Sequence, residues 1–315
     1  MKTAIIYSEE HKLHDDSLHP ENASRVEAIL KALEGSKLPL LHLFARKATK
    51  DEITRVHSNE FYDYLSQPAF EVIGEMTRFN PEVFDGDTYF TDGTFEAALF
   101  SAGSVLTAID AVIEGKSKNA FALSRPPGHH AEKEEARGFC FFNNIAIGAR
   151  YVQSKGMKKV FILDFDVHHG NGTQHMFYED STVFYCSTHQ WPLYPGTGKK
   201  DETGEGKGKG FTLNIPLKAG TGSERYLELM KERIIPAIDN FKPDILLISA
   251  GFDAHKVDPL GGLNLDEECY GKIAEMLKKA AEKRCNGKII FSLEGGYNTP
   301  ALSASVLEVI KALEA

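Results

Sequence analysis

The sequence predicts an α/β fold built on a mostly parallel sheet with helices on its faces. Short runs rich in β-branched and aromatic residues alternate with longer segments of helical period, which is the pattern of repeated strand–helix units. No linker of different composition divides the 315 residues, and 42% of them are hydrophobic, which is enough for a large core. We therefore expect a single domain over residues 1–315.

Seven segments are expected to be strands because each is short and rich in β-branched or aromatic residues. They are Thr3–Tyr7, Ala120–Leu123, Val160–Phe165, Thr182–Cys186, Phe211–Ile215, Ile245–Ala250 and Lys288–Leu293. The segments with helical period are Ala23–Leu33, Phe95–Glu114, Asn144–Lys155, Ser223–Asn240, Asp266–Arg284 and Ala301–Leu313. Ser223 is expected to cap its helix, and Pro236 is expected to bend that helix late.

The segment Gly196–Gly210 (GTGKKDETGEGKGKG) combines six glycines with mixed charges. This composition predicts a mobile surface loop. The glycine spacing does not indicate a phosphate-binding loop, because no Gly-Lys-Ser or Gly-Lys-Thr follows and no helix is expected to start there.

Charge and cysteine content exclude several classes of protein. The net charge of −9, without a cluster of basic residues, argues against nucleic-acid binding and suits a cationic ligand or basic peptide. Four widely separated cysteines without a CxxC pair indicate neither a disulfide framework nor a zinc–thiolate site. No signal peptide and no run of 18 apolar residues is evident, so no membrane contact is expected. We expect a soluble protein of the reducing cytoplasm.

Four of the predicted strands end in glycine and ionisable residues. Ligands bind at the carboxyl ends of the strands in a parallel sheet, so these ends are expected to form one polar site. In chain order, the strands lead into Arg125, His129 and His130; into Asp166, His168 and His169; into Asp253; and into Glu294, Gly295, Gly296 and Tyr297.

Asp166, His168 and Asp253 are the candidate metal ligands. Asp166 and His168 are two residues apart and project to the same side of an extended chain, while Asp253 arrives from another strand. Two carboxylates and an imidazole leave one position open, as in a catalytic zinc site, although iron(II) accepts the same ligands. Asp164 faces the same way as Asp166, and a divalent ion would offset the repulsion between these carboxylates. A single Asp after a strand is more often a turn or cap residue.

His129 and His130 are candidate acid–base residues, because water activated by a metal with two carboxylate ligands needs help in losing its proton. Asp164 and Asn171 are expected to orient one histidine each. The carboxylate should raise the pKa of its partner above that of the other histidine, leaving the pair in different charge states. A histidine pair is also common in polar loops.

Tyr297 follows two glycines, which allow the backbone to approach a site closely. Its phenol could donate a hydrogen bond to the oxyanion of a tetrahedral intermediate. Packing beneath the Gly-Gly turn explains this tyrosine equally well from the sequence alone.

Motifs along most of the chain resemble those of the histone deacetylase family and its bacterial relatives, the acetylpolyamine amidohydrolases and acetoin-utilisation proteins. In order, they are HPENASRVEAIL, FDGDTYFTDGTFEAAL, RPPGHHAEKEEARGFCFFNNIAIGA, ILDFDVHHGNGTQHMFYED, WPLYPGTG, SAGFDAHKVDPLGGL and LEGGYN. The set is highly specific and is most similar to class II-like members. It implies a single arginase-like domain around a mostly parallel, eight-stranded sheet.

The resemblance also implies roles for individual residues. Zn²⁺ would bind Asp166, His168 and Asp253, beside the catalytic residues His129, His130 and Tyr297. The residues implied for the substrate channel are Gly138, Phe139 and Tyr194, with Asp87 at the rim to hold a peptide backbone. Those implied for structural K⁺ are Asp164, Asp166, His168, Ser187 and Thr188 at one site, and Phe177, Asp180, Val183 and Phe211 at another.

Three positions depart from patterns in the family. Asn171 stands where class I members have aspartate, which is typical of class II and should leave His130 less readily charged. Tyr194 replaces a common phenylalanine, so a slightly more polar channel mouth is expected. Leu260 occupies the place of a glutamate that selects polyamines in a relative, which disfavours a dedicated polyamine enzyme.

The first function hypothesis is removal of acetyl or other acyl groups from lysine side chains of proteins or peptides by metal-activated water. The alternatives are a deacetylase of acetylpolyamines or other small acylated amines, a non-catalytic acyl-lysine-binding module, and an arginase-type hydrolase with two manganese ions at Asp253, His255 and Asp258. A binding module would be expected to lack a ligand or the tyrosine, and neither is missing. The strand end at Asp166 offers too few carboxylates for two manganese ions. The sequence does not predict an oligomeric state.

Overall fold

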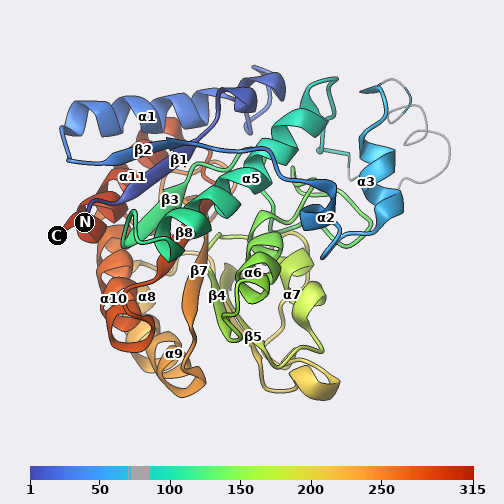
Figure 1. Cartoon of the computed structure of the whole chain (residues 1–315). Coiled ribbons are helices and arrows are strands. Elements are labelled where there is room, and N and C mark those ends of the chain that lie inside the picture. The colour runs from blue at the N-terminus through green and yellow to red at the C-terminus, as the bar shows by residue number, and fades with distance from the viewer. Residues whose placement is uncertain (70, 72–85) are drawn as a thin grey trace.

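A computed structural model of the chain describes residues 1–69, 71 and 86–315. Among these residues, one eight-stranded sheet has the order β2-β1-β3-β8-β7-β4-β5-β6, with all neighbouring strands parallel (Figure 1). The strands are β1 Ala4–Tyr7, β2 Leu41–Phe44, β3 Asn119–Ala122, β4 Val160–Asp164, β5 Val183–Gln190, β6 Thr212–Leu217, β7 Ile245–Ala250 and β8 Ile289–Leu293. The predicted α/β class and eight-stranded parallel sheet are confirmed.

Seven of these strands match predicted segments, and β2 at the edge of the sheet was not predicted. Leu41–Phe44 pairs only with β1, and none of its four residues is fully buried. An edge strand of this kind is specified by its partner more than by its own apolar pattern, so periodicity could not reveal it. Strand β5 also extends to Gln190, four residues beyond its predicted end.

Helices cover both faces of the sheet because its strands are apolar on both sides. Alternate residues of β4 enter two different cores: Val160 and Ile162 enter one, and Phe161 and Leu163 enter the other. The helices that complete the first core are α5 Thr94–Ile113 and α6 Asn144–Ser154 (Figure 1). Those that complete the second are α1 Ser24–Ser36, α8 Ser223–Leu229, α9 Ile235–Phe241, α10 Glu267–Cys285 and α11 Thr299–Glu314.

The helix predicted over Ser223–Asn240 is divided by a π-helical turn, η3 Met230–Ile234, between α8 and α9. Pro236 lies in the first turn of α9, where its missing N–H interrupts regular hydrogen bonding. The prediction of Ser223 as the N-cap is wrong, because Gly222 holds that position. The Ser223 hydroxyl instead accepts a hydrogen bond from the Asp266 amide at 3.3 Å.

Several short helical segments were not predicted. They are η1 Glu9–Leu13, α2 Lys50–Ile53, α3 Asn59–Leu65, α7 Asn171–Phe177 and η2 Gly206–Gly208. None exceeds seven residues, which is too short for a repeating apolar pattern to appear.

The segment Gly196–Gly210 is not simply a surface loop. Gly198, Gly204 and Gly208 are buried, and a Cβ atom at Gly208 would lie 2.3 Å from the carbonyl oxygen of Tyr178. These glycines are therefore required by close packing, which composition alone cannot distinguish from flexibility. His169 contributes to this packing, since its Nδ1 lies 2.7 Å from the Thr197 hydroxyl.

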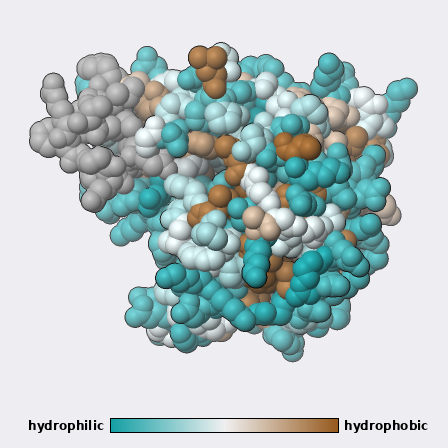
Figure 2. Space-filling model, turned by 180° about the vertical axis from the view of Figure 1, so that it is seen from behind, coloured by the Kyte–Doolittle hydropathy of each residue, from teal (hydrophilic) through white to brown (hydrophobic). Residues whose placement is uncertain are grey.

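The face shown in Figure 2 is mainly hydrophilic, with hydrophobic residues in small separate patches. Among the described residues, α5 alone is long and apolar enough to cross a membrane, and most of it is buried inside the domain.

Candidate active site

The candidate residues meet because their strands are neighbours. Strands β3, β8, β7 and β4 are consecutive in the centre of the sheet, and their carboxyl ends lie at the same edge. The order along the chain differs from the order in the sheet, so residues more than 80 positions apart come into contact, as do Val167 and Asp253. The single polar site predicted from these strand ends is present.

Asp166, His168 and Asp253 converge on one point. The His168 Nδ1 atom lies 3.1 Å from both Asp166 Oδ1 and Asp253 Oδ2. A ring nitrogen has one hydrogen and cannot satisfy two carboxylates, whereas a divalent ion between the three atoms could bind all of them. Ligands at about 2.0–2.1 Å around a tetrahedral zinc ion are separated by about 3.3 Å, so the observed spacing fits such an ion.

Backbone amides hold both carboxylates in the orientation that this arrangement needs. Gly295 N donates to Asp166 Oδ2 at 2.8 Å, and Val167 N donates to Asp253 Oδ1 at 2.8 Å. A Cβ atom at Gly295 would lie 2.2 Å from Asp253 Oδ2, so this position must be glycine for the backbone to approach so closely.

The electrostatics of the two carboxylates also favour a bound cation. Burial, followed by repulsion from the neighbouring Asp166 carboxylate, raises the pKa of Asp253 to about 7. Asp166 is also buried, but His129 and His168 hold its pKa far below the usual range. A buried pair of this kind is costly without a compensating charge, and a divalent ion would supply that charge.

The two histidines have different partners. His129 Nδ1 lies 3.0 Å from Asp164 Oδ2, and His130 Nδ1 lies 2.7 Å from Asn171 Oδ1. Despite burial, Asp164 and Asp166 raise the pKa of His129 to about 10. Burial and the charge of His129 hold the pKa of His130 well below its usual range. One ring is thus charged and the other neutral, as expected from a carboxylate partner and an amide partner.

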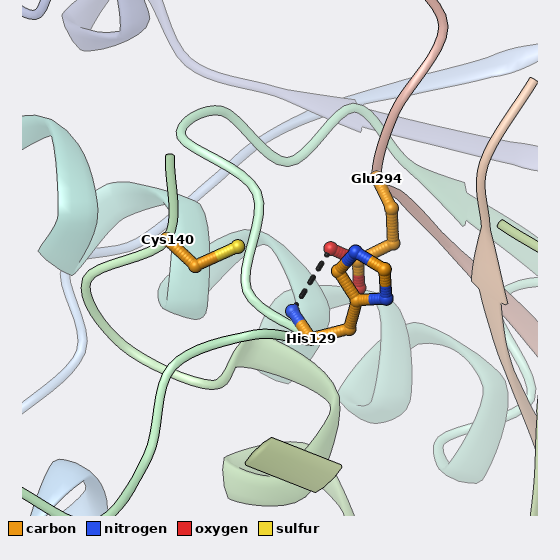
Figure 3. A group of neighbouring side chains, drawn as sticks. All are labelled: His129, Cys140 and Glu294. Atoms are coloured by element: carbon orange, nitrogen blue, oxygen red, sulfur yellow. Dashed lines mark hydrogen bonds between the residues drawn. The ribbon is translucent and has the colours of Figure 1, made fainter. Parts of the chain in front are cut away.

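Glu294 supports the loop that carries these histidines, a role that the sequence analysis did not assign. Its Oε2 accepts from the amides of Gly128 at 2.7 Å and His129 at 3.2 Å, while Oε1 accepts from Ser249 Oγ at 2.9 Å. Figure 3 shows Glu294 beside His129 and Cys140, a trio with the residue types of a metal site. Because three donors already engage the carboxylate, we interpret it as a support for the loop.

Glu21, Arg25 and Arg125 form a buried cluster of charged side chains next to Tyr297. Glu21 Oε1 accepts from Arg25 at 2.9 Å and from Arg125 at 2.8 Å. Arg25 also donates to the Gly296 carbonyl at 2.7 Å, and its guanidinium lies 5.0 Å from the centroid of the Tyr297 ring. All three residues lie in motifs that carry the family resemblance, but their contacts join two separate parts of the chain and were not predicted.

A pocket of about 250 Å³ leads to the candidate metal ligands. Its lining consists of Asp87, His130, Gly138, Phe139, His168, Leu193, Tyr194, Leu260 and Tyr297. The four residues implied for the channel and its rim are among them, together with Leu260, and Leu193 is an addition. In the motif that contains Asp87, residues 84 and 85 lie outside the described part of the chain.

One wall of the pocket is a tight turn between Arg137 and Cys140. The two residues exchange backbone hydrogen bonds of 3.0 Å, and both central residues have positive φ, 56° at Gly138 and 69° at Phe139. Phenylalanine rarely adopts this conformation, which here places its ring edge-on to Tyr297 with 5.8 Å between centroids. A Cβ atom at Gly138 would lie 2.4 Å from the His130 ring.

The residues implied for the first K⁺ site lie beside this site, whereas Val183 of the second group is at the opposite end of β5. Asp164 is opposite Ser187 in the β4–β5 register, and Thr188 Oγ1 lies 3.5 Å from the Asp164 carbonyl oxygen. In the second group, the Phe177 carbonyl accepts from the Asp180 amide at 3.0 Å, and the Phe211 carbonyl accepts from the Tyr185 amide at 2.9 Å. The Asp180 carboxylate already pairs with Arg150 at 2.7 Å.

The residues of the manganese alternative are not gathered into a second metal site within the described part of the chain. Asp258 accepts hydrogen bonds from the amides of Tyr297 at 2.7 Å and Leu260 at 3.0 Å. His255 lies 3.4 Å from Glu267. Asp258 therefore positions the Tyr297 backbone, which argues against the arginase-type alternative.

Comparisons with known proteins agree with this fold. The histone deacetylase domain family matches residues 19–313. The chain is 43% identical over 313 residues to "Histone deacetylase 10, chloroplastic" of Oryza sativa subsp. japonica, covering 95% of this chain and 70% of that protein. It is 41% identical over 324 residues to a "Probable deacetylase" of Archaeoglobus fulgidus, covering 99% and 86%. The crystal structure of the HDA15 HD domain matches with a TM-score of 0.90 and 36% identity, covering 99% of this chain and 90% of that chain.

The chain belongs to the histone deacetylase family. Membership of this family assigns it a deacetylase, and therefore a hydrolase, function.

Proposed function

We propose that the protein is a zinc-dependent deacetylase that removes acetyl or other acyl groups from lysine side chains of proteins or peptides. The observation that carries this proposal is the convergence of Asp166, His168 and Asp253 on one point beside His130 and Tyr297. We take the whole chain as one catalytic domain.

The residues divide the chemistry of amide hydrolysis among them. Zinc held by the three ligands would polarise the substrate carbonyl and lower the pKa of water. His130 is neutral and can accept the proton of the attacking water, while the charged His129 stabilises the negative charge that develops. Burial raises the pKa of Tyr297 well above its usual range, so its hydroxyl stays protonated and donates to the oxyanion. As the amide C–N bond breaks, the dyad returns a proton to the leaving amine.

The pocket supports an acylated lysine as the substrate. Phe139, Tyr194 and Leu260 offer apolar walls to an alkyl chain, and Asp87 is exposed where a peptide backbone could donate to it. The net charge of −9 suits a cationic product, which both lysine and a polyamine would provide. Leu260 offers no charge to a second ammonium group, which favours lysine over a polyamine.

Two further features belong to this proposal. Buried oxygen-bearing residues around Asp164, including Ser187 and Thr188, support a structural K⁺ ion beside the zinc site. The four cysteines are buried thiols without disulfides, which supports a reducing compartment such as the cytoplasm.

Removal of the metal is expected to abolish hydrolysis of an acetyl-lysine peptide, and one equivalent of Zn²⁺ should restore it. Iron(II) added in a parallel sample tests the other metal that these ligands accept. With the metal restored, kcat/KM should be higher for the acetyl-lysine peptide than for acetylated spermidine. Full activity in chelator would refute metal dependence, and a preference for acetylspermidine would favour the polyamine alternative. Binding of the peptide without any turnover would favour the non-catalytic module.

A further inference from the structure

We propose that Glu132 is a positioning residue that fixes the side-chain amide of Asn171 and thereby the tautomer of His130. The hydrogen bonds of Glu132 do not depend on what the protein does. The expected effect on turnover rests on the proposed deacetylase activity. Glu132 lies two residues after His130 and does not line the substrate pocket.

A chain of hydrogen bonds runs from the buried histidine to the surface. His130 Nδ1 lies 2.7 Å from Asn171 Oδ1, and Asn171 Nδ2 donates to Glu132 Oε1 at 2.5 Å. His175 Nδ1 lies 2.9 Å from the same Glu132 oxygen. His130 and Asn171 are buried, whereas the side chain of His175 is 50% exposed and that of Glu132 is 15% exposed. Glu132 is therefore the link between the buried pair and solvent.

The chemistry of these groups permits only one arrangement of protons. An ionised carboxylate can only accept, so the NH₂ group of Asn171 must face Glu132. The Asn171 oxygen then faces His130, whose Nδ1 must carry the hydrogen of the neutral ring. The second ring nitrogen, Nε2, is left unprotonated, and His130 lines the substrate pocket. Nε2 is thus ready to accept a proton.

Asn171 alone could not impose this state. The oxygen and nitrogen of an amide are nearly the same size, so a rotated amide would fit in the same space. It would then present NH₂ to His130 Nδ1 and favour the tautomer with hydrogen on Nε2, which cannot act as a base. A second contact, from Asn171 Nδ2 to the His130 carbonyl at 3.3 Å, is longer than the contact to Glu132. The carboxylate of Glu132 is the stronger constraint.

The backbone holds Glu132 in place for this contact. Its amide donates to the Glu135 carbonyl at 2.9 Å, which closes a turn. The next residue, Lys133, accepts through its carbonyl from the Ser58 amide and contacts His57 Nδ1, both at 3.3 Å. Glu132 is therefore held in place by its own amide and by the residue that follows it.

Kinetics of the zinc-loaded full chain test this proposal. Glu132→Ala is expected to lower kcat about tenfold with little change in KM, as is usual for residues that orient a ligand or base. Glu132→Gln should stay near wild type, because its amide oxygen still accepts from Asn171. Glu134→Ala is the matched control, since it removes the same charge from an exposed position on the same loop. Should Glu132→Ala fail to fold, Glu132→Met removes the acceptor with less loss of packing.

The Asn171→Asp background makes the test specific. A carboxylate at 171 has no NH₂ group to orient, and it would repel Glu132 across the 2.5 Å contact. Glu132→Ala should therefore raise kcat in this background, reversing the sign of its effect. A loss of the same size in both backgrounds would overturn the proposal, as would equal kcat for Glu132→Ala and Glu134→Ala.

A spectroscopic readout separates this proposal from the proposed function. Nitrogen-15 NMR of the zinc-loaded protein should show hydrogen on His130 Nδ1 in wild type and a shift toward hydrogen on Nε2 in Glu132→Ala. This measurement does not require turnover. An unchanged tautomer would overturn the role of Glu132 even if the protein is active. A wild type that hydrolyses no acylated amine would refute the proposed function alone.

Discussion

Replacement of Tyr297 with phenylalanine is expected to lower kcat roughly 10²–10³-fold, with little change in metal content or KM. The hydroxyl would be the donor to the oxyanion, and a donor of this kind contributes mainly in the transition state. The Arg25 guanidinium beneath the ring and the Asp258 contact to the Tyr297 amide should hold the phenylalanine ring in the same place. The loss should therefore reflect the missing hydroxyl and not a displaced loop.

Tyr7→Phe is the matched control for this variant. Tyr7 lies on β1 and packs against Phe44 on β2, with 5.2 Å between ring centroids. The kcat of the Tyr7→Phe variant should equal that of wild type. A Tyr297→Phe variant with more than half of the wild-type kcat would show that another group stabilises the oxyanion. Packing beneath the Gly-Gly turn would then explain why a tyrosine is at position 297.

Gly295→Ala is expected to weaken zinc binding more than 100-fold and to abolish most activity with it. The new methyl group would lie 2.2 Å from Asp253 Oδ2 and 2.6 Å from Asp166 Oδ2, so the ligand oxygens or the loop would have to move. The same residue donates its amide to Asp166, and that contact would move too. Loss of a group that merely orients a ligand costs about 10–100-fold in affinity, and displacement of two ligands should exceed that.

Gly35→Ala provides the matched control because its new methyl group would meet nothing within 4 Å beyond the adjacent backbone of its own helix. Gly35 is in α1, where alanine should stabilise the fold by about 0.5–1 kcal/mol. Equilibrium dialysis against Zn²⁺ and thermal unfolding would measure both effects. Zinc affinity equal to that of wild type in Gly295→Ala would contradict the proposed ligand geometry.

The strand ends show how far the sequence could predict the site. Asp166, His168, Asp253 and Tyr297 each follow an apolar strand, and parallel topology forces such ends to one edge. The motifs that resemble histone deacetylases implied the channel residues as well. The sequence also predicted that Asp164 and Asn171 orient one histidine each, and the structure pairs Asp164 with His129 and Asn171 with His130.

The positioning roles of Glu294 and Glu132 left no signal in the sequence. Glu294 and the Gly128 amide are 166 positions apart, and a carboxylate after a strand has many possible partners. Glu132 lies in a charged run, EKEE, that is typical of a solvated loop. Strand β2 was missed for a similar reason, since its role depends on pairing with β1. Contacts between distant segments decide such roles, and local patterns do not contain them.

The most direct test of the whole account is the position of a transition metal in crystals of the active, zinc-loaded protein. Anomalous scattering collected at the zinc edge should give one strong peak within bonding distance of Asp166, His168 and Asp253, facing His130 and Tyr297. A peak elsewhere with none at these three residues, in protein that still hydrolyses its substrate, would contradict the account.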